Sequence, residues 1–372
     1  MARKRTPRHS QNLLLNRTPI QNSHTSRYLL LTLLSFAFSV SATRLFLNIT
    51  GFPQLGGGSL HIAHVLWGGL LLFIAGLLPL ILANNWALNL SAIISGLGIG
   101  LFIDEVGKFI TANNDYFYAS AAPIIYAFFL LTVLVFVQLR SRHKPSPRST
   151  MYSVITDLKE VLDQDLSQDE KDALLTRLNP IAEQKEEIEL SRLAKVLIDF
   201  LSSSDTRIVP KIPTLLDRIQ AGWITFEAKR LTRKNLKAII VVMLLLWSVW
   251  AIFYPVGFIL SSRTPAQLQT FIQSWLSDRL IRNASGFNWV EARVFMEGIT
   301  GVVAVVAAVF LLAKKEKFGL TLAYLDMLVV LTVVNLVVFY FDQFSTILFA
   351  IPQFILLILI IRYRDRFVRL VL

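Results

Sequence analysis

The chain has 372 residues, of which 54% are hydrophobic, and its mean hydropathy of +0.56 is well above that of an average soluble protein. Its formal net charge of +12 would suit a nucleic-acid partner, but the basic residues stand beside apolar runs. Orientation in a membrane and contact with anionic lipid explain that placement better, so we expect membrane lipids and no nucleic acid as partners. The absence of cysteine excludes disulfide bonds, thiolate metal sites and a cysteine nucleophile.

Eight apolar runs are long enough to cross the roughly 30 Å hydrocarbon core of a bilayer as helices. They predict an all-α fold, a polytopic transmembrane helical bundle. The expected spans are 28–47, 61–83, 86–110, 119–139, 237–260, 292–313, 319–341 and 345–361.

The distribution of basic residues predicts the orientation of these spans. The N-terminal tail, residues 1–27, carries six Lys and Arg and no acidic residue. The segments after the fourth span, before the fifth and after the sixth are also basic, whereas the loops 48–60, 111–118 and 342–345 contain no Lys or Arg. The positive-inside rule therefore places both termini in the cytoplasm.

The same reading divides the chain into parts. A first membrane half, 28–139, precedes a helical cytoplasmic insert, 140–236, and a second membrane half, 237–372. In the second half, residues 265–282 predict an amphipathic helix at the outer interface, which lies either on the leaflet or against the rim of the bundle.

The insert is expected to form a small helical bundle that regulates the protein or binds a cytoplasmic protein partner through residues 143–235. Ser167 and Glu170 have the spacing of a capping box and predict a helix start. We expect Asn179-Pro180 to end that helix.

An internal alignment predicts a duplication of the membrane part. Residues 68–85 align without gaps on 298–315, and each segment is followed by a span that ends in a carboxylate, Asp104 or Asp342. The fold would then be a 4+4 parallel repeat of spans. Chance similarity between two apolar helices is the alternative.

Two polar strings at the ends of neighbouring expected spans predict a functional site. His61-x-x-His64 begins one span and Asp104-Glu105-x-x-Lys108 ends the next. Each of these groups is costly at membrane depth unless it is paired or lines a wet cavity. The orientation brings both strings to the outer level, and the helical spacing within each string places His61 with His64, and Asp104 with Lys108, on one face.

The leading expectation from the residue types at this site is a metal- or acid/base-dependent membrane enzyme. A divalent metal (Zn, Fe or Mn) held by His61, His64, Asp104 and Glu105 is one expectation. Glu105 and Lys108 are the candidate acid and base of a membrane enzyme acting on a lipid-like substrate. The candidate substrate-binding residues, which would join the site from the first span and from an outer loop, are Arg44 and Asp115.

Two other classes of function stay open. A cation- or proton-coupled transporter would use the same residues as a relay. A membrane scaffold or sensor without catalysis would use them only as a buried polar network.

Further polar and small residues stand inside the expected spans. Gly96-x-x-x-Gly100 predicts a close helix-packing face. Asp326 and Asn335 predict a polar lining or an interhelical hydrogen bond. At the outer level we expect a further group, Glu291, Arg293, Glu297 and Asp342.

The stretch from Leu60 to Tyr126 resembles a family of uncharacterised bacterial integral membrane proteins. The resembling strings are His61-x-x-His64-x-x-Trp67-Gly-Gly, Gly100-Leu-Phe-Ile-Asp104-Glu105-Val-Gly-Lys108-Phe and Asn114-Asp-Tyr-Phe-Tyr118. They cover less than a fifth of the chain. The resemblance implies a multi-pass protein of the bacterial inner membrane and implies no chemistry.

Overall fold

The computed structural model of the chain contains helices joined by turns and loops, and no strand, among the residues that it describes. The described residues are 19–51, 63–116, 118–140, 146–184, 187–203, 207–210, 229–261 and 284–368, with single positions from 218 to 227. Several predictions fall outside them. These are His61, the amphipathic helix 265–282 and most of the N-terminal tail.

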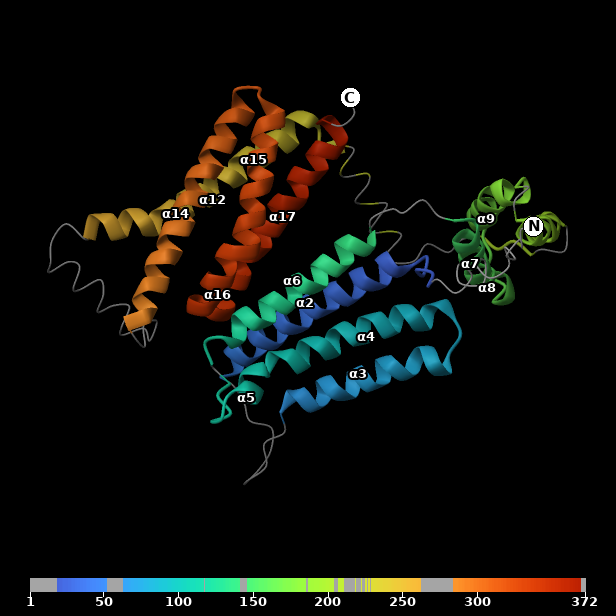
Figure 1. The fold of residues 1–372 in the computed structure, drawn as a ribbon, viewed down its shortest axis with the longest axis horizontal. Coiled ribbons are helices and arrows are strands. Elements are labelled where there is room, and N and C mark those ends of the chain that lie inside the picture. The colour runs from blue at the N-terminus through green and yellow to red at the C-terminus, as the bar shows by residue number, and fades with distance from the viewer. Residues whose placement is uncertain are drawn as a thin grey trace, which may run out of the picture. The chain divides into compact units, whose positions relative to one another are not determined.

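Within the described ranges, eight helical segments are long and apolar enough to cross a membrane, which confirms the predicted number of spans (Figure 1). Helices satisfy their own backbone hydrogen bonds, as hydrocarbon requires. The chain is a multi-pass helical membrane protein. The first four segments are Thr25–Thr50 (α2), His64–Ile81 (α3), Asn85–Asp104 (α4) and Ala121–Arg140 (α6). The second four are Arg233–Ser261 (α12), Ala284–Leu312 (α14), Glu316–Asp342 (α15, η1 and α16 in series) and Ile347–Tyr363 (α17), which continues as η3 to Val368.

The third span is shorter than its apolar pattern indicates, and here the sequence prediction is wrong. Helix α4 ends at Asp104, Glu105 lies in a turn, and a separate short helix, Val106–Ile110 (α5), follows. The side chains of Asp104 and Glu105 bind partners on other elements, and this fixes the backbone where an uninterrupted helix would have continued. Asp104 and Lys108 therefore do not share one helix face.

The seventh span also contains an irregularity. Between Glu316–Val329 (α15) and Asn335–Asp342 (α16), the residues Val330–Val334 (η1) form a π-helical turn. A 3-10 turn, Gln343–Thr346 (η2), then leads into α17.

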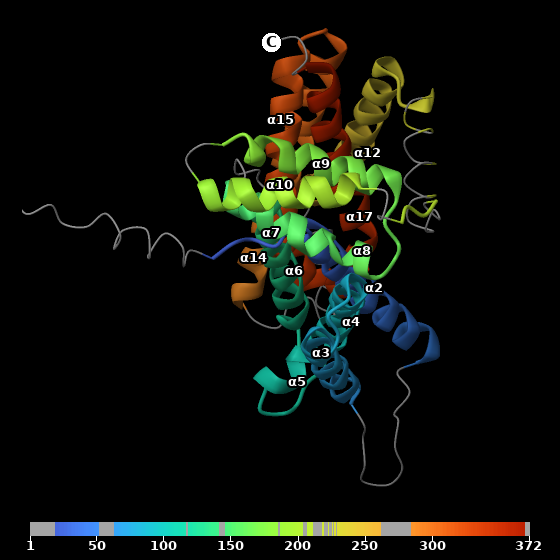
Figure 2. The same ribbon diagram turned by 90° about the vertical axis from the view of Figure 1, so that its right-hand side faces the viewer.

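The chain divides into two compact units. The first comprises 1–36, 70–98 and 133–213, and the described residues of the insert within it form four helices. These are Pro147–Asp157 (α7), Lys159–Leu162 (α8), Gln168–Ala182 (α9) and Ile188–Ser202 (α10). Figure 2 shows α9 and α10 side by side. Leu174 and Leu178 of α9 pack there against Ala194 and Leu201 of α10, all of them buried.

The ends of α9 test two sequence predictions. The capping box is confirmed, because Ser167 and Glu170 bond reciprocally at the helix start. The predicted stop at Asn179-Pro180 is wrong, since α9 continues to Ala182. Proline lacks one backbone donor, and burial of Ile181 in the core of the insert holds the last turn in place.

Within the first unit, the insert is bonded to the short connection between α3 and α4. The Lys159 ammonium donates to the carbonyl of Ala83 at 2.9 Å, and the Asn85 amide donates to Glu160 at 3.1 Å. The segment before α2 is held as well, because the His24 ring lies 2.9 Å from the carboxylate of Asp157.

The second unit comprises 37–69, 99–132 and 214–372. Its α14 packs between α12 and α15, and α17 packs against both α12 and α15 (Figure 1). At one end of this bundle the carboxylate of Glu316 accepts hydrogen bonds from Arg233, Lys237 and Tyr363. This ties α12, α15 and α17 together.

Candidate functional site

The centre of the candidate site is an ion pair between the first and third spans. Asp104 is fully buried and Arg44 is 8% exposed. Arg44 of α2 donates from Nε to Oδ1 of Asp104 and from NH2 to the backbone carbonyl of Asp104 at 2.9 Å. Because Asp104 is the last residue of α4, that carbonyl lacks a partner within its helix. Arg44 thus neutralises the carboxylate and caps the helix at once.

His64 connects this pair to a second carboxylate. Its Nε2 lies 3.0 Å from Oδ2 of Asp104, and its Nδ1 lies 2.8 Å from Oε1 of Glu105. The backbone N–H of His64, the first residue of α3, also donates to Glu105 at 3.1 Å. The turn at Glu105 is what allows one carboxylate on each of two successive residues to reach the same imidazole.

Two aromatic rings enclose the Arg44 guanidinium. Its central carbon lies 4.3 Å from the ring centroid of Tyr116 and 3.7 Å from that of Phe344 in η2. Such cation–π contacts strengthen when water is excluded. The Tyr116 hydroxyl also donates to Asp104 at 2.8 Å. Burial, and next the nearby Asp104 carboxylate, hold the pKa of Tyr116 above its ordinary value, so this hydroxyl keeps its proton.

We refer to Arg44, His64, Asp104, Glu105, Lys108 and Tyr116 as the charged cluster. The Lys108 ammonium completes it, 3.4 Å from Oε1 of Glu105. The carboxylates are sealed, whereas the side chains of His64 and Lys108 are 21% and 22% exposed. The cluster therefore presents His64 and Lys108 at its surface and buries both carboxylates and Arg44.

The structure brings together most of the residues that the sequence singles out. His64, Asp104, Glu105, Lys108 and Arg44 meet in the cluster. Asp115 lies in the loop after α5, where its backbone N–H donates to the hydroxyl of Thr111. Arg44, expected to bind substrate, donates hydrogen bonds to Asp104 from Nε and NH2, and its role in substrate binding stays a prediction.

Two contributors to the site were not expected from the sequence. Tyr116 stands there only within the resembling string Asn114–Tyr118, and Phe344 does not stand out at all. The proximity of Tyr116 to the Asp104 string offers a weak signal. Nothing in the sequence connects Phe344 to a residue three hundred positions earlier.

A second ion-pair group lies between α14 and the end of α16. Arg293 forms two hydrogen bonds with the carboxylate of Asp342, at 2.9 and 2.6 Å, and one with Glu297 at 3.3 Å. The expected gathering of these three residues is confirmed.

The hydrogen bonds of the charged cluster determine the charge that His64 carries. Carboxylates only accept hydrogen bonds, so an imidazole that bonds to both of them must carry two N–H groups and a positive charge. Release of one proton from His64 leaves two cations, Arg44 and Lys108, opposite two carboxylates. The cluster is thus neutral without that proton and carries one positive charge with it.

The geometry of the charged cluster also bears on the divalent-metal site that the sequence predicts. Among the described residues, no group of three His, Asp or Glu side chains is arranged to hold a metal ion. Both ring nitrogens of His64 face carboxylates, so a metal would have to replace one of these contacts. Metal binding remains a prediction.

In comparisons with known proteins, no family model, curated protein or solved structure matches the chain. The functional argument therefore depends on the geometry of the site.

Proposed function

We propose that the protein is a proton-coupled membrane transporter and that the charged cluster is its proton-exchange site. The observation that carries the proposal is the His64 ring, with one nitrogen 3.0 Å from Asp104 and the other 2.8 Å from Glu105. Chains of Asp, Glu and His within membrane helices are characteristic of proton relays in pumps and transporters.

The charges of the cluster support a proton as the species exchanged. Loss of a proton from His64 removes one of its two hydrogen bonds and leaves an imidazole lone pair facing a carboxylate. Binding and release of this proton therefore change both the charge of the cluster and the hydrogen bonds of His64 to Asp104 and Glu105. These two residues belong to the end of α4 and to the turn after it, so the change acts on the contact between spans.

The predicted orientation gives the relay a direction. It places the start of α3 and the end of α4 at the external side of the membrane. A partly exposed His64 would then take protons from outside, while the sealed carboxylates lie behind it.

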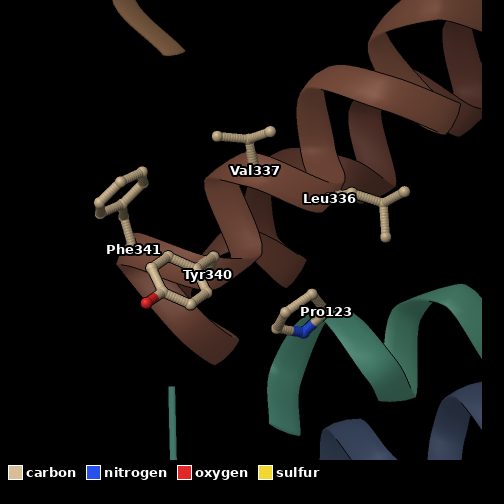
Figure 3. A pocket seen from close by; sticks show the side chains of 5 residues that line it. All are labelled: Pro123, Leu336, Val337, Tyr340 and Phe341. Carbon is tan, nitrogen blue, oxygen red and sulfur yellow. The ribbon is translucent and has the colours of Figure 1, made fainter. Parts of the chain in front are cut away.

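An apolar groove supports a second candidate, an acid–base enzyme acting on a lipid-like substrate. A cavity of about 320 Å³ is lined by Pro123 of α6 and by Leu336, Val337, Tyr340 and Phe341 of α16 (Figure 3). Phe341 directly precedes Asp342, the partner of Arg293. An acyl chain in the groove would lie beside the segment that carries the Arg293–Asp342 pair, and the acid of such an enzyme would be His64 or Lys108 of the charged cluster.

Charge displacement after a rapid pH jump tests the transporter without knowledge of its substrate. Full-length protein in liposomes, adsorbed on a solid-supported membrane, is exposed to pH steps over about 6 to 10, because two carboxylates bonded to an imidazole favour its charged form. We expect a transient current in the wild type and loss of most of it in His64→Gln.

His24→Gln is the matched control, because His24 also contacts an aspartate but lies before α2 and outside the cluster. It should leave the current unchanged. A current in His64→Gln equal to that of the wild type would overturn the proposal. Histidine NMR of labelled wild-type protein gives a second measurement in case His64→Gln does not fold.

The same samples discriminate the other candidates. Elemental analysis of wild type and His64→Ala tests the metal prediction, since stoichiometric metal lost in the variant would support a metal enzyme. Absence of any pH-induced current, together with turnover of a lipid that depends on His64, would favour the enzyme over the transporter.

A further inference from the structure

Asp326 is a buried carboxyl group inside the seventh span, far in sequence from both ends of that span. It lies in α15, ten residues after Glu316, and is 4% exposed. Its Oδ2 is buried with no hydrogen-bond partner among the described residues, and no described residue forms an ion pair with it. At 1.5 Å of rise per residue, it stands about 15 Å from the start of α15, which is mid-membrane depth.

The surroundings of Asp326 are apolar. Ala323, Met327 and Val330, which lie one turn away or adjacent on the same helix, belong to the core of the second unit and are fully buried. Isolated carboxylates are very costly in such surroundings, and structures usually avoid the cost by pairing or by neutralisation.

Titratable groups on the elements packed against α15 have other partners. On α14, Arg293 and Glu297 bond to each other, and Arg293 also bonds to Asp342. On α17, Arg362 bonds to Glu227 and Tyr363 bonds to Glu316. The turn η1 contains no titratable residue. None of these groups supplies a positive charge to Asp326 in the described part of the chain.

The backbone next to Asp326 is irregular and makes polar contacts with other spans. Asp326 lies one turn before the π-helical turn at Val330, and such turns are frequent at functional sites. Leu331, in the turn, accepts a hydrogen bond from the hydroxyl of Tyr126 in α6 at 2.7 Å. Directly after the turn, the Asn335 amide donates to Gln353 of α17 at 2.7 Å.

We propose that Asp326 is a proton-binding site within the membrane, at which the transporter carries the coupled proton between the two sides. The inference rests on the proposed transport function and adds a second site to it. In the loading step an O–H bond forms at Oδ2, and the hydronium ion that gives the proton becomes water. The neutral carboxyl then needs no charge partner. In the unloading step the proton returns to water, and the ionised group favours an arrangement of the spans that exposes it.

A proton fits this site better than a metal cation. Sodium, calcium or magnesium needs several oxygen ligands, whereas the buried residues beside Asp326 along the chain, Ala323, Met327 and Val330, offer hydrocarbon and one thioether. Neutralisation by a single proton requires no further ligand.

Infrared difference spectroscopy of the full chain in liposomes tests the proposal. A protonated carboxyl has a carbonyl stretch separate from that of a carboxylate. We expect the wild type to show this band near pH 7, to lose it on strong alkalinisation, and to shift it when aspartate is labelled with carbon-13. Asp326→Asn should lack the band.

Asp342→Asn is the control, because Asp342 ends the same span but is paired with Arg293. The aspartate band should persist in this variant. Labelling of the wild type keeps the test valid if Asp326→Asn does not fold. An unshifted band, or a band unchanged in Asp326→Asn, would overturn the assignment.

Charge-displacement measurements distinguish a failure of the Asp326 site from a failure of the proposed transport function on which the inference rests. Asp326→Asn should retain the fast current that depends on His64 and lose a slower component, the movement of the proton across the membrane. A wild-type current without any component sensitive to Asp326 would contradict this inference and leave the role of His64 intact. A current that follows sodium at constant pH would also overturn it.

Discussion

Arg44 is the buried cationic partner of Asp104 in the candidate site. Its guanidinium lies between Tyr116 and Phe344 while it bonds to both the carboxylate and the carbonyl of Asp104. A buried pair of this kind is not required to add stability, but loss of one member leaves the other as an unpaired buried charge.

Arg44→Met should therefore lower the free energy of unfolding by about 3 to 5 kcal/mol. The measurement is thermal or denaturant unfolding of the purified protein in detergent. Arg140→Met, a change of an exposed arginine at the end of α6, should have little effect. The double variant Arg44→Met, Asp104→Leu should recover much of the loss. Additive losses would mean that the two side chains are not coupled.

Asp157 of the insert makes stability depend on pH. Burial alone would raise its pKa, but hydrogen bonds from His24 and Arg177 outweigh this and lower the pKa below the ordinary value of 3.8. A carboxyl group with a lowered folded-state pKa contributes stability above its unfolded pKa and loses it as the pH falls through the folded pKa.

We therefore expect the contacts of Asp157 to be fully effective at neutral pH and to weaken below about pH 4. Asp157→Asn should lower the free energy of unfolding by about 1 kcal/mol or less at neutral pH, since the three side chains are partly exposed. In acid the wild type loses the same contacts, so the variant and the wild type should be equally stable there. Amide hydrogen exchange of α7 and α9, compared with wild type at each pH, measures this. Asp199→Asn, an exposed aspartate on α10, is the control. Equal differences at acidic and neutral pH would contradict the linkage.

At the residue scale, the sequence predicted the cluster by polarity and depth. His64, Asp104 and Glu105 are conspicuous because few ionisable groups occur within apolar runs. The partners were harder to foresee. Whether Lys108 pairs with Asp104 or Glu105 depends on one turn of backbone, and the choice of Phe344 as the ring over Arg44 depends on tertiary packing alone.

At the scale of elements, apolar pattern predicted helix existence better than helix ends. Side-chain contacts to other elements end α4 at Asp104, and core packing extends α9 past Pro180. Neither effect is local, so neither can be read from capping or breaking residues. The close-packing face at Gly96 was predictable, because small residues in membrane spans usually mark helix contacts.

Gly96→Ala should separate α2 from α4. A Cβ at this position would lie 2.3 Å from the backbone carbonyl of Thr32 and 2.0 Å from the hydroxyl of Ser35. The backbone must move, at an expected cost of about 1 to 3 kcal/mol. Thermal stability in detergent measures the effect.

Gly76→Ala is the matched control, since nothing lies within 4 Å of its added Cβ. It should be neutral or slightly stabilising, because alanine favours helix. If both variants lost the same stability, the contact at Gly96 would not be the cause.

At the scale of the whole molecule, hydropathy and span length were sufficient for the fold class and the number of spans. The 4+4 repeat remains a prediction. So does the orientation, which a chain free of cysteine makes simple to test.

Single cysteines introduced at Asn113 and Asp199, both exposed, should report opposite sides of the membrane. In intact cells, an impermeant maleimide should label Asn113→Cys, in the loop after α5. It should label Asp199→Cys, in the insert, only after lysis. The reverse pattern would invert the topology and place the charged cluster on the cytoplasmic side.

The pairing of Arg44 with Asp104 has a consequence for the synthesis of the protein. The two residues are separated by 60 positions, so Arg44 leaves the ribosome two spans before its partner exists. An arginine within a span raises the free energy of insertion by up to about 3 kcal/mol. The first span would remain beside the insertion machinery until α4 arrives, and the first three spans would enter the lipid together.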